Sequence, residues 1–282
     1  MQIGFIGQGF IGKSYADDFE ARGYSPVRYA TSAPYVQNKE AIASCDIVFI
    51  AVPTPSTPEG FDASIVDEVL ALIGEGKTAV IKSTVLPGTT EMLQSKHPNI
   101  TVMHSPEFLT EKTAAYDAEH PNRNIVGICE DTPEVRAKAA EVISVLPVAP
   151  YAAVIPVKEA EFIKYGGNCW FYFKVLYINI LFDMATELNL DWQTIKEGMA
   201  ADPRIGSTHL DPIHQSGRGA GGHCFIKDFA ALKELHAKLL PGDQMSADIL
   251  LALERKNNTL LRTSGKDLDI LEGVYGSIPA AE

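Results

Sequence analysis

The first half of the chain alternates short apolar runs with stretches of helical periodicity. Short segments rich in apolar residues, which are typical of buried parallel strands, occupy residues 3–6, 46–52, 78–84, 101–106 and 124–129. Helical stretches lie between them at residues 63–74, 89–96 and 132–145. Strand–helix–strand repetition predicts an α/β fold with a Rossmann-like, doubly wound parallel sheet.

The second half of the chain has helical periodicity throughout. A long pattern runs from about residue 157 to 189, and shorter ones follow at residues 191–200, 228–240 and 246–263. We therefore expect a dinucleotide-binding domain at 1–156 and an all-helical domain with a long central helix at 157–282. The loop at 202–224 is long for a compact helical domain, and loops of this kind are usually functional.

A glycine motif, G-x-G-x-x-G, begins directly after the first strand. Gly7 permits a tight turn, Gly9 lets the backbone approach a pyrophosphate, and Gly12 lets helix and strand pack closely. The N-terminus of the following helix would face the anion. The second strand, at 26–32, lacks the acidic residue that usually holds the ribose hydroxyls and carries Arg28 instead. The sequence thus predicts a dinucleotide site and leaves NAD and NADP both open.

Three polar or proline-rich segments follow the strands of the predicted sheet. They read "PTPST" after residue 52, "STVLPGTT" after residue 82 and "SPEFLTEK" after residue 104. Ligands of doubly wound sheets bind beyond the carboxyl ends of the strands. These segments are therefore expected to line the cofactor and substrate sites.

Composition narrows the class of partner. The net charge of −12 argues against nucleic acid, because neutralising phosphates needs a basic surface. The most apolar segment, 169–182, is interrupted by Lys174 and is shorter than the roughly 20 residues of a spanning helix. We expect a cytoplasmic protein without a membrane or metal site, since the cysteines lack metal-ligand spacing. Covering the apolar stretch 169–188 calls for a homodimer.

The stretch "GAGGHCFIKD", residues 219–228, places a thiol in an unusual setting. Cys224 follows three glycines and precedes Lys227 and Asp228, whereas a structural cysteine normally lies among apolar side chains. This favours a nucleophile in a flexible polar loop. The other cysteines, which lie in apolar contexts and are expected to be structural, are Cys45, Cys129 and Cys169.

Seven segments together resemble one family over nearly the whole chain. They are, in order, "GQGFIG", "VPTPS", "STVLPGTT", "SPEFLTE", "EAEFIKYGGN", "DPRIG" and "GAGGHCFIKD". The chain is similar to the UDP-glucose/GDP-mannose dehydrogenases, the nucleotide-sugar 6-dehydrogenases. In that family a primary alcohol is oxidised twice with NAD. The intermediate aldehyde is held on a cysteine as a thiohemiacetal and then as a thioester, which water cleaves to the acid.

The resemblance implies a role for each matching residue. Cys224 would be the nucleophile, and Lys164 would stabilise oxyanions with Asn168 on the next helical turn. Asp228 would act with Lys164 on the water or proton chain, and Thr84 would orient that water.

Two glutamates complete the implied set. Glu107 would be a general base or act in thioester hydrolysis, and Glu111 would support the nicotinamide end. The implied cofactor-binding residues are Gly7, Gly9, Phe10, Ile11, Gly12, Thr31, Val52, Pro53, Thr54, Ser83, Thr84, Glu111 and Lys227. The implied substrate-binding residues are Glu107, Phe108, Leu109, Lys164, Asn168, Arg204, Gly219, Gly221 and Gly222.

The chain also departs from the family pattern. His223 stands where the family usually has serine, Ile226 stands where it has proline, and the family's third domain is not expected within 282 residues. The substrate could therefore be a nucleotide sugar or a related sugar or nucleoside alcohol. Two alternatives stay open: a two-electron 3-hydroxyacid dehydrogenase that uses Lys164 and Asn168, and a non-catalytic binding homologue.

Overall fold

The computed structural model describes residues 1–215 and 217–276. Internal contacts divide the chain into two units. The sheet unit comprises Met1–Thr54 and Asp62–Lys164, and the helical unit comprises Pro55–Phe61 and Tyr165–Glu282. The predicted division at 156/157 differs from this by the first turns of the long helix and by the short segment 55–61. Residues 277–282 of the predicted helical domain lie outside the described residues.

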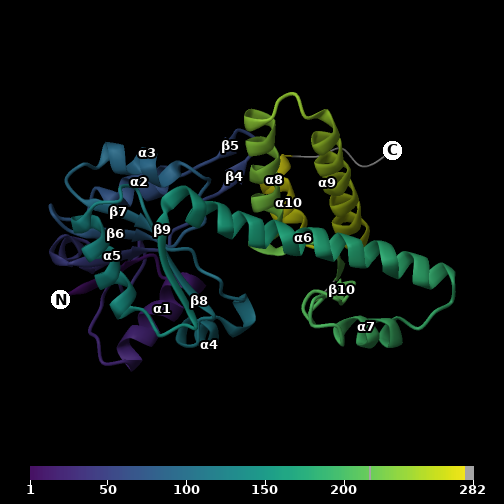
Figure 1. Cartoon of the computed structure of the whole chain (residues 1–282), viewed down its shortest axis with the longest axis horizontal. Coiled ribbons are helices and arrows are strands. Elements are labelled where there is room, and N and C mark those ends of the chain that lie inside the picture. The colour runs from purple at the N-terminus through teal and green to yellow at the C-terminus, as the bar shows by residue number, and fades with distance from the viewer. Residues whose placement is uncertain (216, 277–282) are drawn as a thin grey trace. The chain divides into compact units, whose positions relative to one another are not determined.

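The sheet unit is built on a seven-stranded, mostly parallel sheet, which confirms the predicted Rossmann-like class (Figure 1). The strand order is β2-β1-β3-β6-β7-β8-β9. The chain therefore changes direction across the sheet at β1, between β2 and β3. The strands are β1 (Ile3–Ile6), β2 (Val27–Tyr29), β3 (Ile47–Ile50), β6 (Thr78–Ile81), β7 (Thr101–His104), β8 (Arg123–Ile128) and β9 (Tyr151–Pro156).

Two features of this sheet differ from the sequence prediction. First, β8 pairs antiparallel with β7, because α4 (Ala114–Glu119) lies against α1 (Phe10–Ala21) and the chain returns without crossing the sheet. Secondly, β9 was not predicted. It forms an edge strand parallel to β8, and its residues are exposed or partly buried, unlike those of the central strands.

The remaining segments of the sheet unit are short helices around an aromatic core. They are α2 (Ser64–Leu70), α3 (Thr89–Lys96), α5 (Pro133–Val145) and the 3-10 helices η1 (Val36–Asn38), η2 (Glu40–Ser44) and η3 (Glu111–Thr113). Phe5 and Phe49 stack at 5.1 Å between ring centroids, and Phe19 of α1 packs edge-on against both. This contact fixes α1, and with it the glycine turn, on the sheet.

The long helix α6 (Val157–Glu187) confirms the predicted central helix. Its first turns belong to the sheet unit, where the buried Glu161 carboxylate accepts hydrogen bonds from the backbone of Gly88 and Thr90, at 2.6 and 2.8 Å, and from the Thr90 hydroxyl. A carboxylate is stabilised at the N-terminus of a helix, here α3. These bonds tie α6 to the sheet unit.

The helical unit packs the rest of α6 against α8 (Gly222–Leu239) and α9 (Gln244–Ser264) (Figure 1). Tyr172 of α6 and Phe229 of α8 stack at 3.9 Å, and Leu250 and Leu260 of α9 close this core. The other elements are α7 (Trp192–Ala200), α10 (Leu268–Tyr275) and the hairpins β4–β5 (Ser56–Thr57, Gly60–Phe61) and β10–β11 (Ile213–His214, Gly217–Arg218).

The helical unit differs from the prediction in one helix boundary and one additional helix. α8 begins at Gly222 rather than Asp228, because Gly221 serves as its N-cap and Asp267 accepts a hydrogen bond from the Gly222 amide at 2.7 Å. α10 was not predicted, and its Leu271 and Val274 are buried beside Ile226. Within residues 1–215 and 217–276, no helix has both the length and the apolar character needed to cross a membrane.

Candidate active site

The glycine turn has the geometry that a dinucleotide phosphate needs. Gly7 adopts φ +91°, and a β-carbon there would lie 2.2 Å from the Ala51 carbonyl oxygen. A β-carbon on Gly12 would lie 2.0 Å from the Gly7 carbonyl oxygen, whereas one on Gly9 would meet nothing within 4 Å. Gly7 and Gly12 therefore permit the close packing of strand and helix. Gly9, the N-cap of α1, leaves its backbone open to a ligand.

The loops after β3 and β6 are bonded to each other at the carboxyl edge of the sheet. The Ser83 hydroxyl accepts from the Val52 amide at 3.0 Å and donates to the Val52 carbonyl at 2.7 Å. The Thr54 hydroxyl donates to the Thr84 carbonyl at 2.7 Å. The structure thus brings together these residues, which the sequence assigned to the cofactor site.

Arg28 of β2 is engaged by its own chain. Its guanidinium is buried and forms ion pairs with Asp17 and Glu20 of α1, at 2.7 and 2.8 Å. A guanidinium that is neutralised twice offers little attraction to a 2′-phosphate. The argument from Arg28 for NADP therefore loses its support, while Thr31 remains exposed after the end of β2.

A buried carboxylate–lysine pair lies at the same edge of the sheet. Lys164 of α6 and Glu107, in the loop after β7, form an ion pair of 2.7 Å, with the two side chains 5% and 3% exposed. The second Glu107 oxygen accepts from the Leu109 amide at 2.8 Å. Lys164 is therefore not a solvated surface residue, and the pair has the burial expected of acid–base machinery.

Phe108 connects this pair to a second cation. The Arg123 guanidinium lies 3.7 Å from the Phe108 ring centroid, and the Lys164 ammonium lies 5.7 Å from it. By contrast, Glu111 in η3 is exposed and does not join the buried pair.

The helical unit carries a second buried carboxylate. Asp228 of α8 is 1% exposed and accepts a hydrogen bond of 2.6 Å from the side-chain amide of Asn168. Its other oxygen pairs with the Lys227 ammonium at 2.6 Å. Three residues that the sequence assigned to the site therefore meet within this unit.

Cys224 lies in the first turn of α8, not in a flexible loop as predicted. It is half-buried and is reduced, as are the other three cysteines. The N-terminus of a helix stabilises a thiolate electrostatically. Burial instead raises the pKa of Cys45 to about 11 and that of Cys129 to about 12. Cys224 thus occupies a setting suited to a nucleophile, whereas Cys45 and Cys129 do not.

Residues far along the chain hold the glycine segment before Cys224, and sequence reasoning missed them. The Asn257 side chain accepts from the Ala220 amide at 2.7 Å and donates to the Ala220 carbonyl at 3.0 Å. The Lys266 ammonium donates to the Gly219 carbonyl at 3.0 Å. Asn257 is buried on an amphipathic helix, and a polar residue on an apolar face was the one available signal.

The predicted glycines of this segment have different surroundings. A β-carbon on Gly221 would lie 1.9 Å from an Asp267 carboxylate oxygen, and one on Gly219 would lie 3.1 Å from the Asn257 oxygen. Gly222, with φ +76°, has open space there. Packing within the unit therefore explains Gly219 and Gly221. Arg204 is exposed and bonded to Asp202.

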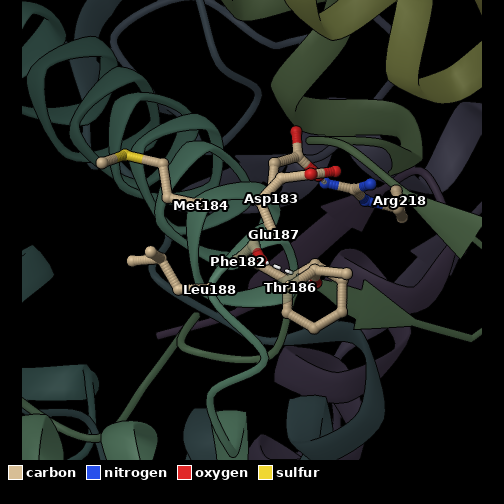
Figure 2. Close-up of a pocket in the computed structure, with 7 residues that line it drawn as sticks. All are labelled: Phe182, Asp183, Met184, Thr186, Glu187, Leu188 and Arg218. Atoms are coloured by element: carbon tan, nitrogen blue, oxygen red, sulfur yellow. Dashed lines mark hydrogen bonds and ion pairs between the residues drawn. The ribbon is translucent and has the colours of Figure 1, made fainter.

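One hollow of about 550 Å³ lies at the end of α6 and contains none of the predicted site residues (Figure 2). Met184 and Leu188 form its apolar side, and Arg218 pairs with Asp183 at 2.6 Å on the other. The Thr186 hydroxyl donates back to the Phe182 carbonyl. In the described part of the chain, no cluster of three His, Cys, Asp or Glu residues could hold a metal ion.

Comparison with known proteins places this geometry in a family. Residues 30–144 match the NAD binding domain of the UDP-glucose/GDP-mannose dehydrogenase family, and residues 158–259 match its central domain. The first match indicates NAD as the cofactor of the sheet unit.

Named relatives agree with this family match. A UDP-glucose 6-dehydrogenase of Rhizobium meliloti is 33% identical over 207 residues, which are 69% of this chain and 46% of that protein. The UDP-glucose 6-dehydrogenase YwqF of Bacillus subtilis is 29% identical over 253 residues, 84% of this chain and 54% of that protein. The chain thus spans about half the length of these relatives.

Solved structures share the fold. A UDP-glucose dehydrogenase from Pyrobaculum islandicum superposes with a TM-score of 0.78 at 26% identity, covering 93% of this chain and 68% of that one. A 3-hydroxyisobutyrate dehydrogenase of Mycobacterium tuberculosis has a TM-score of 0.68 at 15% identity, covering 96% and 98%, and shares the fold alone. The matches to both family domains, together with the 33% identity to a named relative, establish that the chain belongs to the UDP-glucose/GDP-mannose dehydrogenase family.

Proposed function

We propose that this protein is an NAD-dependent dehydrogenase that oxidises the primary alcohol of a nucleotide sugar, or of a related sugar or nucleoside, to a carboxylic acid. The observation that carries the proposal is the Glu107–Lys164 pair, buried at the ligand edge of a sheet whose glycine turn suits a dinucleotide. The relatives named UDP-glucose 6-dehydrogenase support this substrate class.

The residues of the sheet unit would serve the first oxidation. Bound NAD supplies the hydride acceptor for both oxidations. Glu107 can accept the hydroxyl proton of the alcohol, and the Lys164 ammonium can stabilise the alkoxide that forms, because a preorganised charge in a buried site acts strongly. In this role Glu107 and Lys164 act together.

The residues of the helical unit would serve the second oxidation. The Cys224 thiolate would add to the aldehyde carbon, forming a C–S bond as the C=O π bond opens, and protonation of the oxygen would give a thiohemiacetal. Loss of the hydroxyl proton, and of the carbon-bound hydrogen as hydride to the acceptor that NAD supplies, would then give the thioester. Water then attacks the thioester carbon, the C–S bond breaks, and the thiol is regenerated with the acid. Asp228, held by Asn168, would receive the proton of that water.

A substrate screen tests this function directly. Purified protein is incubated with NAD and with UDP-glucose, GDP-mannose, free nucleosides or sugar phosphates, and reduced cofactor is counted against product. Two equivalents of reduced cofactor per carboxylate are expected. No turnover with any of these alcohols would contradict the proposal.

A two-electron 3-hydroxyacid dehydrogenase is the second candidate. A solved structure of that class aligns with this chain over 98% of its own length. It requires no thiol and releases a carbonyl product with one equivalent of reduced cofactor. The product count in the same screen separates the two candidates.

We also propose that the protein is a homodimer joined through α6. Trp170, Tyr177 and Met184 are 64, 57 and 56% exposed and follow one another at seven-residue spacing, which places them on one side of the helix. Leu188 continues this apolar stripe to the hollow at the end of α6. A second copy would cover it, because an isologous interface pairs a patch with itself.

Light scattering of the wild type and of a Tyr177→Asp variant tests the dimer. A dimeric mass for the wild type and a monomeric mass for the variant are expected. A monomeric wild type at micromolar concentration would overturn the proposal.

A further inference from the structure

Lys82 is a buried lysine that the proposed mechanism does not use. It follows β6 at the ligand edge of the sheet and is 3% exposed. Its ammonium donates to the Ser105 hydroxyl at 3.0 Å and lies 4.4 Å from the centroid of the Tyr15 ring. Among the residues that the structure describes, no carboxylate forms an ion pair with it. Burying an unpaired ammonium is costly, so a purely structural side chain here would ordinarily be apolar.

The surroundings of Lys82 bring it under the influence of the Glu107–Lys164 pair. Ser105, its hydrogen-bond partner, lies two residues before Glu107 in the same loop and is itself 1% exposed. The Glu107 carboxylate raises the pKa of Lys82, against the larger effect of burial. The edge therefore holds two buried amines and one buried carboxylate.

We propose that Lys82 is a positioning residue whose protonation switches the basicity of Glu107. This proposal rests on the dehydrogenase function proposed above. When Lys82 is protonated, Glu107 is under the influence of two positive charges and is a weaker base. When Lys82 is neutral, Lys164 alone compensates Glu107, which is then a stronger base. The hydrogen bond to Ser105 keeps the amine beneath this loop in both states.

Of Lys82, His104 and Tyr15, only Lys82 is expected to change its charge near neutral pH. Burial lowers the pKa of Lys82 to about 7. Burial and the charge of Lys82 lower the pKa of His104, on β7, to about 3, so that ring stays neutral. Burial and the charge of Glu107 raise the pKa of Tyr15 of α1, so the phenol stays protonated.

Three further carboxylates and cations complete these surroundings. Asp18 of α1 and Asp117 of α4 also raise the Tyr15 pKa, and Lys164 of α6 lowers that of His104.

Nuclear magnetic resonance of protein labelled with [ε-13C]lysine tests the switch without relying on activity. The Lys82 resonance is assigned by its loss in Lys82→Gln, and we expect its midpoint between about pH 6 and 8.5. In Glu107→Gln the midpoint should fall, because the stabilising carboxylate is gone. A midpoint above pH 9.5, or one that Glu107→Gln does not move, would overturn the proposal.

The pH profile of kcat/KM tests its consequence. For wild type we expect kcat/KM to fall as the pH drops through the Lys82 midpoint and to level off at the lower value of the protonated form. Lys82→Gln keeps a hydrogen-bond donor for Ser105 but cannot titrate, so its profile should be flat there and stay within about threefold of wild type at pH 8.5. Lys77→Met is the matched control, since Lys77 precedes the same strand and pairs with Asp46.

The outcomes separate the switch from a structural role and from the proposed function. A uniform loss of activity at every pH in Lys82→Gln, or retention of the wild-type profile, would refute the switch. Absence of turnover in wild type would refute the proposed function, and the two resonance midpoints would still decide whether Glu107 and Lys82 are coupled.

Discussion

The two buried carboxylates of this protein are held in different ways. Glu107, in the sheet unit, is paired with Lys164, which is distant in sequence and almost as buried as Glu107 itself. Asp228, in the helical unit, is paired with its own neighbour Lys227, which is 20% exposed, and with the neutral amide of Asn168. The charge of Glu107 is therefore compensated by one buried cation from a distant part of the sequence, whereas that of Asp228 is shared between a neutral amide and a partly exposed cation.

This difference predicts which of the two carboxylates changes its basicity more when a nearby charge changes. A carboxylate compensated by one buried cation is sensitive to every other charge nearby, which is why Lys82 matters for Glu107. Asp228 has a partly exposed cation beside it and should respond less to distant charges. Cys224, which shares α8 with Asp228, follows a glycine segment that is held by hydrogen bonds from its backbone to Asn257 and Asp267.

The largest expected effect comes from removing the thiol of the helical unit. Cys224→Ser should reduce carboxylate formation to below about one thousandth of wild type, because an alcohol is a far weaker nucleophile toward an aldehyde than a thiolate. Product analysis by mass spectrometry measures it. Cys129→Ser is the control, since Cys129 is also half-buried but belongs to the sheet unit. Unchanged carboxylate yield in Cys224→Ser would show that the helical unit contributes no nucleophile.

The next largest effect is the loss of fold stability when each carboxylate loses its cation. Lys164→Met leaves Glu107 buried without its cation and should cost about 3–5 kcal/mol of unfolding free energy. Lys227→Met leaves Asp228 with Asn168 and should cost about 1 kcal/mol. Urea titration of both variants measures the difference.

A double variant checks the cause. Lys164→Met with Glu107→Gln should recover most of the loss, since replacing both partners removes the unpaired charge. Equal losses in Lys164→Met and Lys227→Met would contradict the contrast drawn between the two sites.

A smaller effect is expected from loosening the glycine segment. Asn257→Ala removes both hydrogen bonds to Ala220 and should cost about 1–3 kcal/mol, because buried backbone groups lose their partner. The Cys224 thiol should react faster with an alkylating reagent, followed by mass spectrometry. Asn258→Ala, one residue further along α9, is the matched control. An unaltered alkylation rate in Asn257→Ala would show that the segment is held without Asn257.

Local pattern predicted the sheet and the residues at its edge, because strands and the turns after them are contiguous in sequence. Gly7, Ser83 and Glu107 each lie within three residues of the end of a buried strand, and the parallel arrangement brings such positions together. The direction of β8 could not be predicted in this way, because it depends on α4 packing against α1. The start of α8 and the support of Ala220 also escaped prediction, since Asp267 and Asn257 lie far along the chain and act through tertiary contacts.

The smallest expected effect concerns the cofactor. Asp17→Asn with Glu20→Gln removes the two carboxylates that pair with Arg28 and should free its guanidinium for a 2′-phosphate. The ratio of kcat/KM for NADP to that for NAD should rise by up to about tenfold, which is the scale of one partly exposed ion pair. Glu40→Gln is the control, because Glu40 is exposed and forms no ion pair with Arg28. Kinetics with both cofactors at low salt give the ratio. If the double variant keeps the wild-type ratio, the ion pairs of Arg28 do not determine which cofactor this protein prefers, and the preference must come from elsewhere in the turn after β2.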